Sequence, residues 1–215
     1  MRLLADADAF GSAGLGRRDA LWAVRRLPDD APLPLFAAAE ARELGAEAPS
    51  DLPVMALPEE IATDYQTIRL SLKGHPLQIL RPLFRAERVS TCADIAAAPD
   101  GRRARVAGVV LVRQRPGNGK AIFVTLEDET GIANLVLWAR TFERFRREVM
   151  SARLMVAEGL VQKSPEGVVH LMTARVFDRT AELDRLPDAD RSLADPVRAR
   201  HPRDVRILPK SRDFH

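Results

Sequence analysis

Five segments of alternating apolar and polar residues, separated by glycine-containing turns, fill much of the second half of the chain. The expected strands are residues 105–115, 121–127, 132–138, 154–162 and 168–177. A helix is expected at residues 141–150, between the third and the fourth strand. Gly108 lies inside the first strand and marks a bulge or a point of strong coiling. Five short strands with one helix in this position indicate a small barrel.

This order of elements is typical of the oligonucleotide/oligosaccharide-binding fold, or OB-fold, which we place at residues 102–178. The predicted fold class is therefore α+β, with a helical region at residues 1–88 and a short helix and linker at residues 89–101. The barrel follows, with its helix between strands 3 and 4. Residues 179–215 are charged and interrupted by prolines, so we expect an extended basic tail. Because such barrels usually hold single-stranded nucleic acid, this pattern also bears on function.

Helical periodicity organises the first region. It predicts helices at residues 17–27, 35–44, 59–72 and 76–84. Thr91 and Asp94 fit a capping box at the start of a further short helix. The run from Gly14 to Ala20 matches the hairpin of helix-hairpin-helix DNA-binding proteins. That pattern is short, and a plain helix–turn–helix connection is the alternative.

Several classes of protein find no support in the sequence. No apolar run approaches the roughly 18–20 residues that span a bilayer, and acidic residues follow Met1 too early for a secretory signal. We therefore expect a cytoplasmic protein without a membrane partner. Cys92 has no second cysteine for a disulfide or a thiolate metal site. The histidines have no metal-like spacing and no catalytic or phosphate-loop motif is found, so we expect no cofactor in this chain (His75, His170, His201, His215).

Positive charge is concentrated in the half of the chain that carries the barrel pattern. The net charge of the whole chain is +3. Residues 101–215 contain 22 Lys and Arg against 15 Asp and Glu, whereas residues 1–100 contain 11 against 15. This asymmetry indicates a polyanionic partner for the barrel. The alternative is a solvated surface rich in arginine, because an excess of this size is mild.

Alternation within the second and third strands separates barrel-facing from outward-facing side chains. The side chains expected inside the barrel are Val124, Leu126, Leu135 and Leu137. Phe123, Asn134 and Trp138 then point outwards. Outward aromatic residues on strands 2 and 3 are where OB-folds stack bases. The alternative for Phe123 or Trp138 is packing beneath the tail or against the helical region.

Basic residues cluster along the first strand and the turn after it, with no acidic residue between the first and the last (Arg102, Arg103, Arg105, Arg113, Arg115, Lys120). Arginine forks pair with phosphate oxygens, so this basic strip predicts contacts with a nucleic-acid backbone. The candidate nucleic-acid-binding residues are Arg103, Arg105, Arg113, Arg115, Lys120, Phe123, Asn134 and Trp138. Four further arginines have glutamates nearby and are interpreted as a solvated helix face (Arg140, Arg144, Arg146, Arg147). His170 is interpreted as a packed or exposed histidine, not a ligand.

Several segments resemble one protein family, in order along nearly the whole chain. Residues 112–117 and 125–134 resemble the C-terminal barrel of bacterial C-family DNA polymerases. Residues 201–215 resemble the C-terminus of the error-prone branch, the damage-inducible paralogue of the replicative polymerase III alpha subunit. Residues 7–10 and 17–22 resemble the end of that family's helix-hairpin-helix region, and residues 64–76 contain matches to the helical segment that follows it.

The resemblance implies that the chain is a C-terminal piece of an error-prone DNA polymerase, a DNA-directed nucleotidyltransferase of translesion synthesis and DNA repair. That family carries its catalytic aspartates, and the Mg²⁺ that they bind, in a palm domain N-terminal to the region resembled here. We therefore expect this piece to bind single-stranded template DNA near the active site. We do not expect it to polymerise DNA on its own.

The resemblance also implies protein partners. Sliding-clamp-binding peptides often read Gln-Leu-x-Leu-Phe, and Leu33, Leu35 and Phe36 match this pattern. Pro32 replaces the glutamine and removes a contact, so packing of Leu35 and Phe36 in a helical core is the preferred interpretation. Two other functions stay open: a module that docks accessory proteins of the translesion complex, and a tRNA-anticodon-binding OB domain. The closing run and the upstream helices argue against the second.

Overall fold

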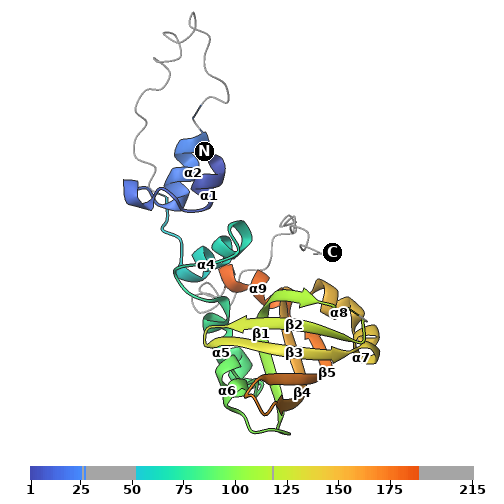
Figure 1. Cartoon of the computed structure of the whole chain (residues 1–215). Helices are drawn as coiled ribbons and strands as arrows, with labels where there is room; N and C mark the ends of the chain where they lie inside the picture. Colours follow the sequence, from blue (N-terminus) through green and yellow to red (C-terminus); the bar gives the residue numbers. More distant parts are fainter. Residues whose placement is uncertain (26, 28–51, 118, 189–215) are drawn as a thin grey trace, which may run out of the picture. The chain divides into compact units, whose positions relative to one another are not determined.

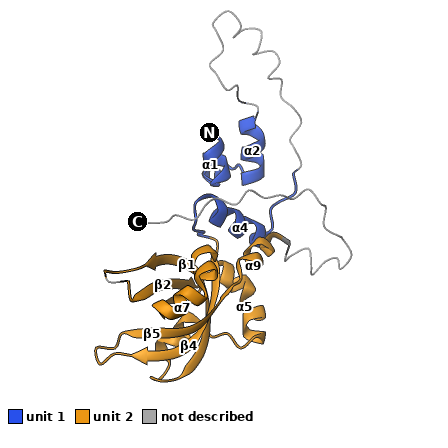
Figure 2. Cartoon of the chain, turned by 90° about the vertical axis from the view of Figure 1, so that its right-hand side faces the viewer, with its two compact units in different colours: residues 1–72 blue, residues 73–215 orange. Residues whose placement is uncertain are grey.

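The computed structural model describes residues 1–25, 27, 52–117 and 119–188. The chain divides into two compact units, residues 1–72 and 73–215 (Figure 2). The helix expected at residues 35–44, the clamp-like segment and most of the tail lie outside the described residues.

The first unit is helical, as expected. It contains α1 (Arg2–Asp6), the short 3₁₀ helix η1 (Gly11–Ala13), α2 (Arg17–Arg25) and α4 (Leu57–Thr67). Arg17 is buried and forms an ion pair with Asp64 of α4, and the Ser71 hydroxyl donates to the same carboxylate at 2.6 Å. Arg18 donates to Glu59 at 2.8 Å. The two arginines of the glycine hairpin therefore join α2 to α4.

The second unit contains the expected barrel (Figure 1). Its strands are β1 (Arg103–Gln114), β2 (Ala121–Asp128), β3 (Gly131–Trp138), β4 (Leu154–Lys163) and β5 (Val169–Asp178). The strands close in the order β1-β2-β3-β5-β4, and only the β3–β5 pairing is parallel. The helical segment between β3 and β4 consists of α7 (Ala139–Arg144) and α8 (Arg146–Ser151), separated at Phe145. The predicted OB-fold is thereby confirmed.

The interior of the barrel follows the alternation of the strands. Val124, Leu126, Leu135 and Leu137 are each at most 1% exposed, as the sequence predicts. The helical segment between β3 and β4 adds Phe142 and Val149 to the same core. Successive side chains of a strand point to opposite sides, so the residues that alternate with these leucines and valines on β2 and β3 point away from the barrel interior.

Two glycines let the strands bend tightly enough to close the barrel. At Gly108, a Cβ atom would lie 2.6 Å from the Leu126 Cβ, so β1 passes very close to β2. The irregularity in the β1–β2 pairing falls between Val110 and Val112, so Gly108 marks the coiling point and not the bulge. At Gly159, a Cβ atom would lie 2.1 Å from the carbonyl oxygen of Met172.

The barrel unit begins at Lys73. The sequence pattern predicts that residues 73–88 belong to the helical region instead. The helix α5 (Pro76–Ala86) supplies Leu77 and Phe84 to a buried cluster with barrel residues such as Ala107. The next helix, α6 (Cys92–Ala97), starts with the expected capping box, because Thr91 and Asp94 exchange both hydrogen bonds. Because α5 buries its apolar face on the barrel, it belongs to that unit.

The start of the tail differs from the extended chain expected there. Residues after β5 form α9 (Thr180–Asp184) and the 3₁₀ helix η2 (Leu186–Asp188). Leu186 is 1% exposed and Leu183 packs against the cluster that contains Leu77. Arg179 holds Glu87 through two hydrogen bonds of 2.7 and 2.8 Å. Burial of two leucines thus folds a segment that looks only charged and proline-interrupted in sequence.

The close approach at Gly159 predicts a large effect of a single methyl group. We expect Gly159→Ala to lower the free energy of unfolding by about 2–3 kcal/mol, because β4 must move away from the backbone of β5. Gly11→Ala is the control, since a Cβ atom there meets nothing within 4 Å. Urea unfolding followed by circular dichroism measures both, and equal midpoints for Gly159→Ala and wild type would contradict this account.

The start of α5 predicts a pH effect. The Nδ1 atom of His75 accepts a hydrogen bond from Leu77 N at 3.1 Å, and burial lowers the pKa of His75. As the pH drops, His75 is protonated in the unfolded chain at a higher pH than in the folded protein. The free energy of unfolding therefore falls as the pH drops through the unfolded-state pKa of histidine, about 6.5. His75→Asn keeps an N-cap acceptor without a titrating group, so the loss of stability between about pH 7 and 5.5 should be smaller. Urea midpoints at the two pH values test this, and an identical pH dependence in both proteins would refute it.

Candidate nucleic-acid interface

The outer surface of β2 and β3 brings together three of the residues predicted from sequence. The register pairs Ala121 with Trp138, Phe123 with Val136 and Thr125 with Asn134. Their side chains share one face, because directly paired residues of antiparallel strands lie on the same side of a sheet. Trp138 is 56% exposed, which is unusual for the largest apolar side chain. We call the outer side of β2 and β3 that carries Phe123, Thr125, Asn134, Val136 and Trp138 the strand face, in which Val136 is itself buried.

Phe123 is only partly exposed, and a histidine of β5 packs against it. The rings of Phe123 and His170 are 6.3 Å apart and meet edge to face at 73°. His170 lies on β5, which pairs with β3, so the contact passes over the strand between them. The interpretation of His170 as a packed residue fits this contact. Trp138 is therefore the more open aromatic surface of the two, and Phe123 is held in place.

The polar residues at one end of the strand face are linked. The Thr125 hydroxyl donates to the Asn134 Oδ1 atom at 3.1 Å. This bond orients the Asn134 amide next to Phe123, on the side away from Trp138, and leaves its NH₂ group as a donor. An oriented amide beside exposed aromatic rings can bond to the edge of a base while a ring stacks on the base.

Three of the predicted basic residues lie at the surface near the ends of β1. Arg103 is exposed at the start of β1, and Arg115 and Lys120 are exposed on the connection between β1 and β2. Arg115 Nη2 donates to the carbonyl oxygen of Gly119 at 3.3 Å, and its guanidinium carbon lies 5.8 Å from the Phe142 ring centroid. The carbonyl oxygen of Lys120 accepts from Ala139 N, which joins this connection to the start of α7.

Arg105 is not an unopposed cation, which corrects the prediction of a basic strip without a counter-charge. Its Nε atom lies 2.7 Å from Glu158 Oε1, and its Nη1 atom donates to the carbonyl oxygen of Glu87. Glu158 is the direct neighbour of Arg105 in the β1–β4 pairing. The sequence distance between the two residues hides this ion pair.

Arg113 is likewise used within the fold. It donates to the carbonyl oxygens of Val149, at 2.5 Å, and of Ala152, at the C-terminal end of α8. A cation at a helix C-terminus satisfies carbonyl groups that have no partner inside the helix. Arg105 and Arg113 therefore hold the barrel together, whereas the other four members of the strip are exposed (Arg102, Arg103, Arg115, Lys120).

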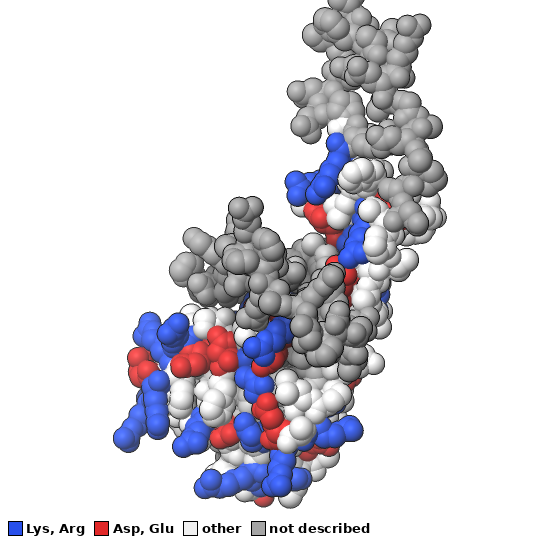
Figure 3. Space-filling model, turned by 180° about the vertical axis from the view of Figure 1, so that it is seen from behind, with Lys and Arg blue, Asp and Glu red and all other residues white. Residues whose placement is uncertain are grey.

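The arginines of α7 and α8 and their neighbours behave as the solvated face that the sequence suggests. Arg146 pairs with Glu143 at 3.5 Å, and both side chains are more than half exposed. Figure 3 shows basic and acidic side chains interleaved over the second unit on the face that it draws. Charge on that face is mixed, so the nucleic-acid contacts are better sought beside the exposed aromatic residues.

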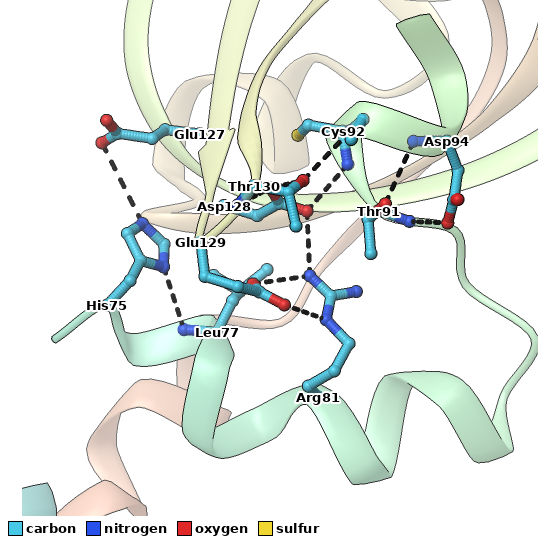
Figure 4. A network of polar contacts seen from close by, with 11 residues as sticks. His75, Leu77, Arg81, Thr91, Cys92, Asp94, Glu127, Asp128, Glu129 and Thr130 are labelled. Atoms are coloured by element: carbon cyan, nitrogen blue, oxygen red, sulfur yellow. Dashed lines mark hydrogen bonds and ion pairs between the residues drawn. The ribbon is translucent and has the colours of Figure 1, made fainter. Parts of the chain in front are cut away.

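Sequence reasoning missed the ion-pair network that holds the β2–β3 turn (Figure 4). Arg81 of α5 donates from Nη2 to Asp128 Oδ2 at 2.9 Å and to Glu129 Oε2 at 2.7 Å. The same Asp128 oxygen accepts from Cys92 N at 2.8 Å, and Asp128 Oδ1 accepts from Thr130 N. The hydrogen bond to Glu129 raises the pKa of Arg81. The only signal in the sequence is an acidic pair in a turn, which turn chemistry alone explains.

Two negative findings concern the described part of the chain. No helix there is long and apolar enough to cross a membrane. No group of three or more His, Cys, Asp or Glu side chains there could hold a metal ion. The residues described do not fit the Mg²⁺ site that the resemblance places in a palm domain, so we derive no metal-dependent step from them.

Comparisons with known proteins agree with this geometry. Residues 104–177 match a family model described as an OB-fold nucleic acid binding domain. The chain is 59% identical over 233 residues to an error-prone DNA polymerase of Rhodopseudomonas palustris, which covers 99% of this chain and 21% of that protein. It is 58% identical over 216 residues to an error-prone DNA polymerase of Brucella abortus, covering 99% and 20%.

Among solved structures, asparaginyl-tRNA synthetase from Pyrococcus horikoshii is 25% identical with a TM-score of 0.37, covering 41% of this chain and 22% of that one. An OBody bound to hen egg-white lysozyme is 18% identical with a TM-score of 0.37, covering 43% and 94%. The family model thus gives residues 104–177, which form the barrel, a likeness to OB-fold nucleic acid binding domains. The resemblance to error-prone DNA polymerases is confirmed over 99% of the chain, which spans about a fifth of the length of these relatives.

The Arg81 network predicts a large loss of stability when one partner is removed. We expect Arg81→Met to lower the free energy of unfolding by about 3 kcal/mol, because it leaves the fully buried Asp128 carboxylate without a counter-charge. Adding Asp128→Asn should recover part of the loss. Arg153→Met is the control, since its pair with Asp184 is partly exposed and should cost under about 1 kcal/mol. Equal losses of unfolding free energy in Arg81→Met and Arg153→Met would show that the buried network stabilises the fold no more than an exposed ion pair does.

Proposed function

We propose that this chain is the nucleic-acid-binding module of an error-prone DNA polymerase and that its strand face holds single-stranded template DNA. The observation that carries the proposal is the 56% exposure of Trp138 beside Phe123 and Asn134 on β2 and β3. The similarity to error-prone DNA polymerases over 99% of the chain supports the choice of DNA as the partner.

The strand face supplies two kinds of contact. Trp138 and Phe123 offer stacking surfaces, which are worth about 1–3 kcal/mol for each base. Asn134 offers a fixed amide donor to a base edge. Because stacking accepts every base and one amide discriminates little, this binding has weak sequence preference.

The phosphate contacts come from Arg103, Arg115 and Lys120. Counterion release on binding single strands lowers log K by about 0.7 for each phosphate neutralised per unit of log salt. Three contacts therefore give a slope of about −2. Arg105 and Arg113 act indirectly, because they hold β4 and α8 against β1, the strand that carries Arg103 and leads into the connection with Arg115 and Lys120.

The module acts without chemistry of its own. The residues on the strand face stack, donate hydrogen bonds and attract phosphate, and none of them is placed to move a proton or to hold a metal. Polymerisation by the larger protein would use Mg²⁺ bound elsewhere, so a chelator should leave the affinity of this chain for DNA unchanged.

Substitutions of Trp138 test the stacking contact, and a substitution of Arg115 tests the phosphate contact. We expect Trp138→Ala to weaken binding of a labelled oligothymidylate about tenfold, and Trp138→Phe to restore most of the affinity, because one stacked base is lost and regained. Arg115→Ala should lower the affinity and reduce the salt slope by about 0.7. Fluorescence anisotropy at two or more salt concentrations gives both quantities.

Phe177→Ala is the matched control for Phe123→Ala. It removes an exposed aromatic side chain on β5, outside the strand face, and should bind DNA like wild type. Unchanged affinity in Trp138→Ala and Phe123→Ala would rule out the strand face as the binding site. Absence of DNA binding would leave a module for accessory proteins, and tighter binding of tRNA than of single-stranded DNA would favour the anticodon-binding alternative.

A further inference from the structure

A hollow beside the C-terminal half of α5 gathers three arginines. It has a volume of about 270 Å³ and is lined by Arg81, Arg85, Arg88, Ser90, Thr91 and Asp94. These residues come from α5, from the first turn of α6 and from the segment between the two helices, all within the second unit. None of them belongs to the strand face.

The guanidinium of Arg81 has a donor left over. Its Nε and Nη2 atoms bond to Glu129 and Asp128 on one edge of the group (Figure 4). A guanidinium is planar, so the Nη1 atom points away from both carboxylates. This atom is buried and has no hydrogen-bond partner among the residues described. A buried donor without a partner costs free energy, and an acceptor delivered by a ligand would remove that cost.

Two more guanidiniums at the hollow are uncommitted. The side chains of Arg85 and Arg88 are exposed, and neither forms a hydrogen bond or an ion pair within the described ranges. Thr91 Oγ1 already accepts from Asp94 N, so its hydroxyl proton remains a donor, as does that of Ser90. The hollow therefore offers five donor groups, including three fork-shaped cations.

Arg88 adopts a backbone conformation that favours glycine. Its φ angle is +59°, and it ends α5 in a pattern in which Arg88 N donates to Arg85 O and Val89 N donates to Phe84 O. Glycine is the usual residue at this position of a helix C-cap. A positive φ angle at a non-glycine residue costs free energy, and here the residue that bears this cost is one of the arginines that line the hollow.

One carboxylate opposes the arginines. Asp94 lines the hollow, and the hydrogen bond that it accepts from the Thr91 backbone lowers the pKa of Asp94, so it is ionised at neutral pH. Arg81 is already paired with Asp128 and Glu129, and Arg85 and Arg88 against Asp94 still leave the lining positive. Asp128 and Glu129 lie on the opposite edge of the Arg81 guanidinium and hold it in place.

We infer that this hollow binds a phosphate group through Arg85, Arg88 and the free edge of Arg81, with the two hydroxyls as further donors. Arginine forks match the paired oxygens of phosphate, and the combination of a fixed guanidinium and two adaptable ones suits a tetrahedral anion. The phosphate is either one in a nucleic-acid backbone or a free ion such as inorganic phosphate or pyrophosphate.

Inorganic phosphate tests the site directly. The experiment is a nuclear magnetic resonance titration of the ¹⁵N-labelled chain with inorganic phosphate, at constant ionic strength and with chloride as the balancing ion. The signals to follow are those of the arginine Nε–H groups and of the backbone amides. The expected result is a set of saturable shifts at Arg85, Arg88, Ser90 and Thr91. Arg88→Gly keeps the left-handed conformation and the helix end, and should weaken binding about tenfold.

Two controls separate the site from general effects of charge. Arg69 also has a positive φ angle, +65°, so Arg69→Gly makes the same chemical change in the first unit and should leave the phosphate affinity unchanged. Arg144→Ala/Arg147→Ala removes two exposed arginines outside the hollow. Shifts that do not saturate, or equal losses of affinity in Arg88→Gly and Arg69→Gly, would overturn the inference.

An oligothymidylate identifies the source of the phosphate. If the ligand is a backbone phosphate, inorganic phosphate competes with the oligonucleotide and Arg88→Gly weakens its binding. If the ligand is a free ion, the oligonucleotide leaves the Arg85 and Arg88 signals unmoved. Both outcomes support a phosphate site and do not depend on whether the strand face binds DNA.

Discussion

The contact on which the barrel unit most depends is the ion pair between Arg81 and the acidic turn of β2 and β3. Asp128 is fully buried, and its two oxygens meet α5, the first amide of α6 and its own turn. One carboxylate thus fixes where two strands reverse and where two helices lie against them. Because β2 and β3 carry Phe123, Asn134 and Trp138, the position of the strand face follows from this buried pair.

The strand face is a consequence of how the barrel closes. Side chains alternate along a strand, so every leucine and valine that fills the interior is followed by an outward residue. Gly108 and Gly159 allow the close approaches that the curved strands need. The exposed Trp138 and the partly exposed Phe123 have no role in this interior. The function that we propose for them is stacking on the bases of single-stranded DNA.

Alternation is a local property, and this is why the sequence predicts the five strands, the barrel interior and the outward residues of β2 and β3 correctly. Partners distant in sequence are not local. Arg105 meets Glu158, and Arg113 reaches carbonyl groups 36 and 39 residues away, so two of the six cations in a strip that looks unopposed in sequence are committed to the fold. The short helix α9 was missed for the same reason, because Leu183 and Leu186 find their apolar neighbours only in the folded barrel. Alternation places Phe123, Asn134 and Trp138 on the outside of the barrel. That they bind single-stranded DNA stays a prediction.

The most direct test is a nuclear magnetic resonance titration of the ¹⁵N-labelled chain with a short oligothymidylate at low salt. The chain has two tryptophans, so the indole signals of Trp138 and Trp22 report on the two units separately. This account predicts that the Trp138 indole and the amides of Phe123 and Asn134 shift together and saturate at one stoichiometry, while the Trp22 indole stays in place. Shifts confined to the first unit or to β4, with Trp138 unmoved, would contradict it.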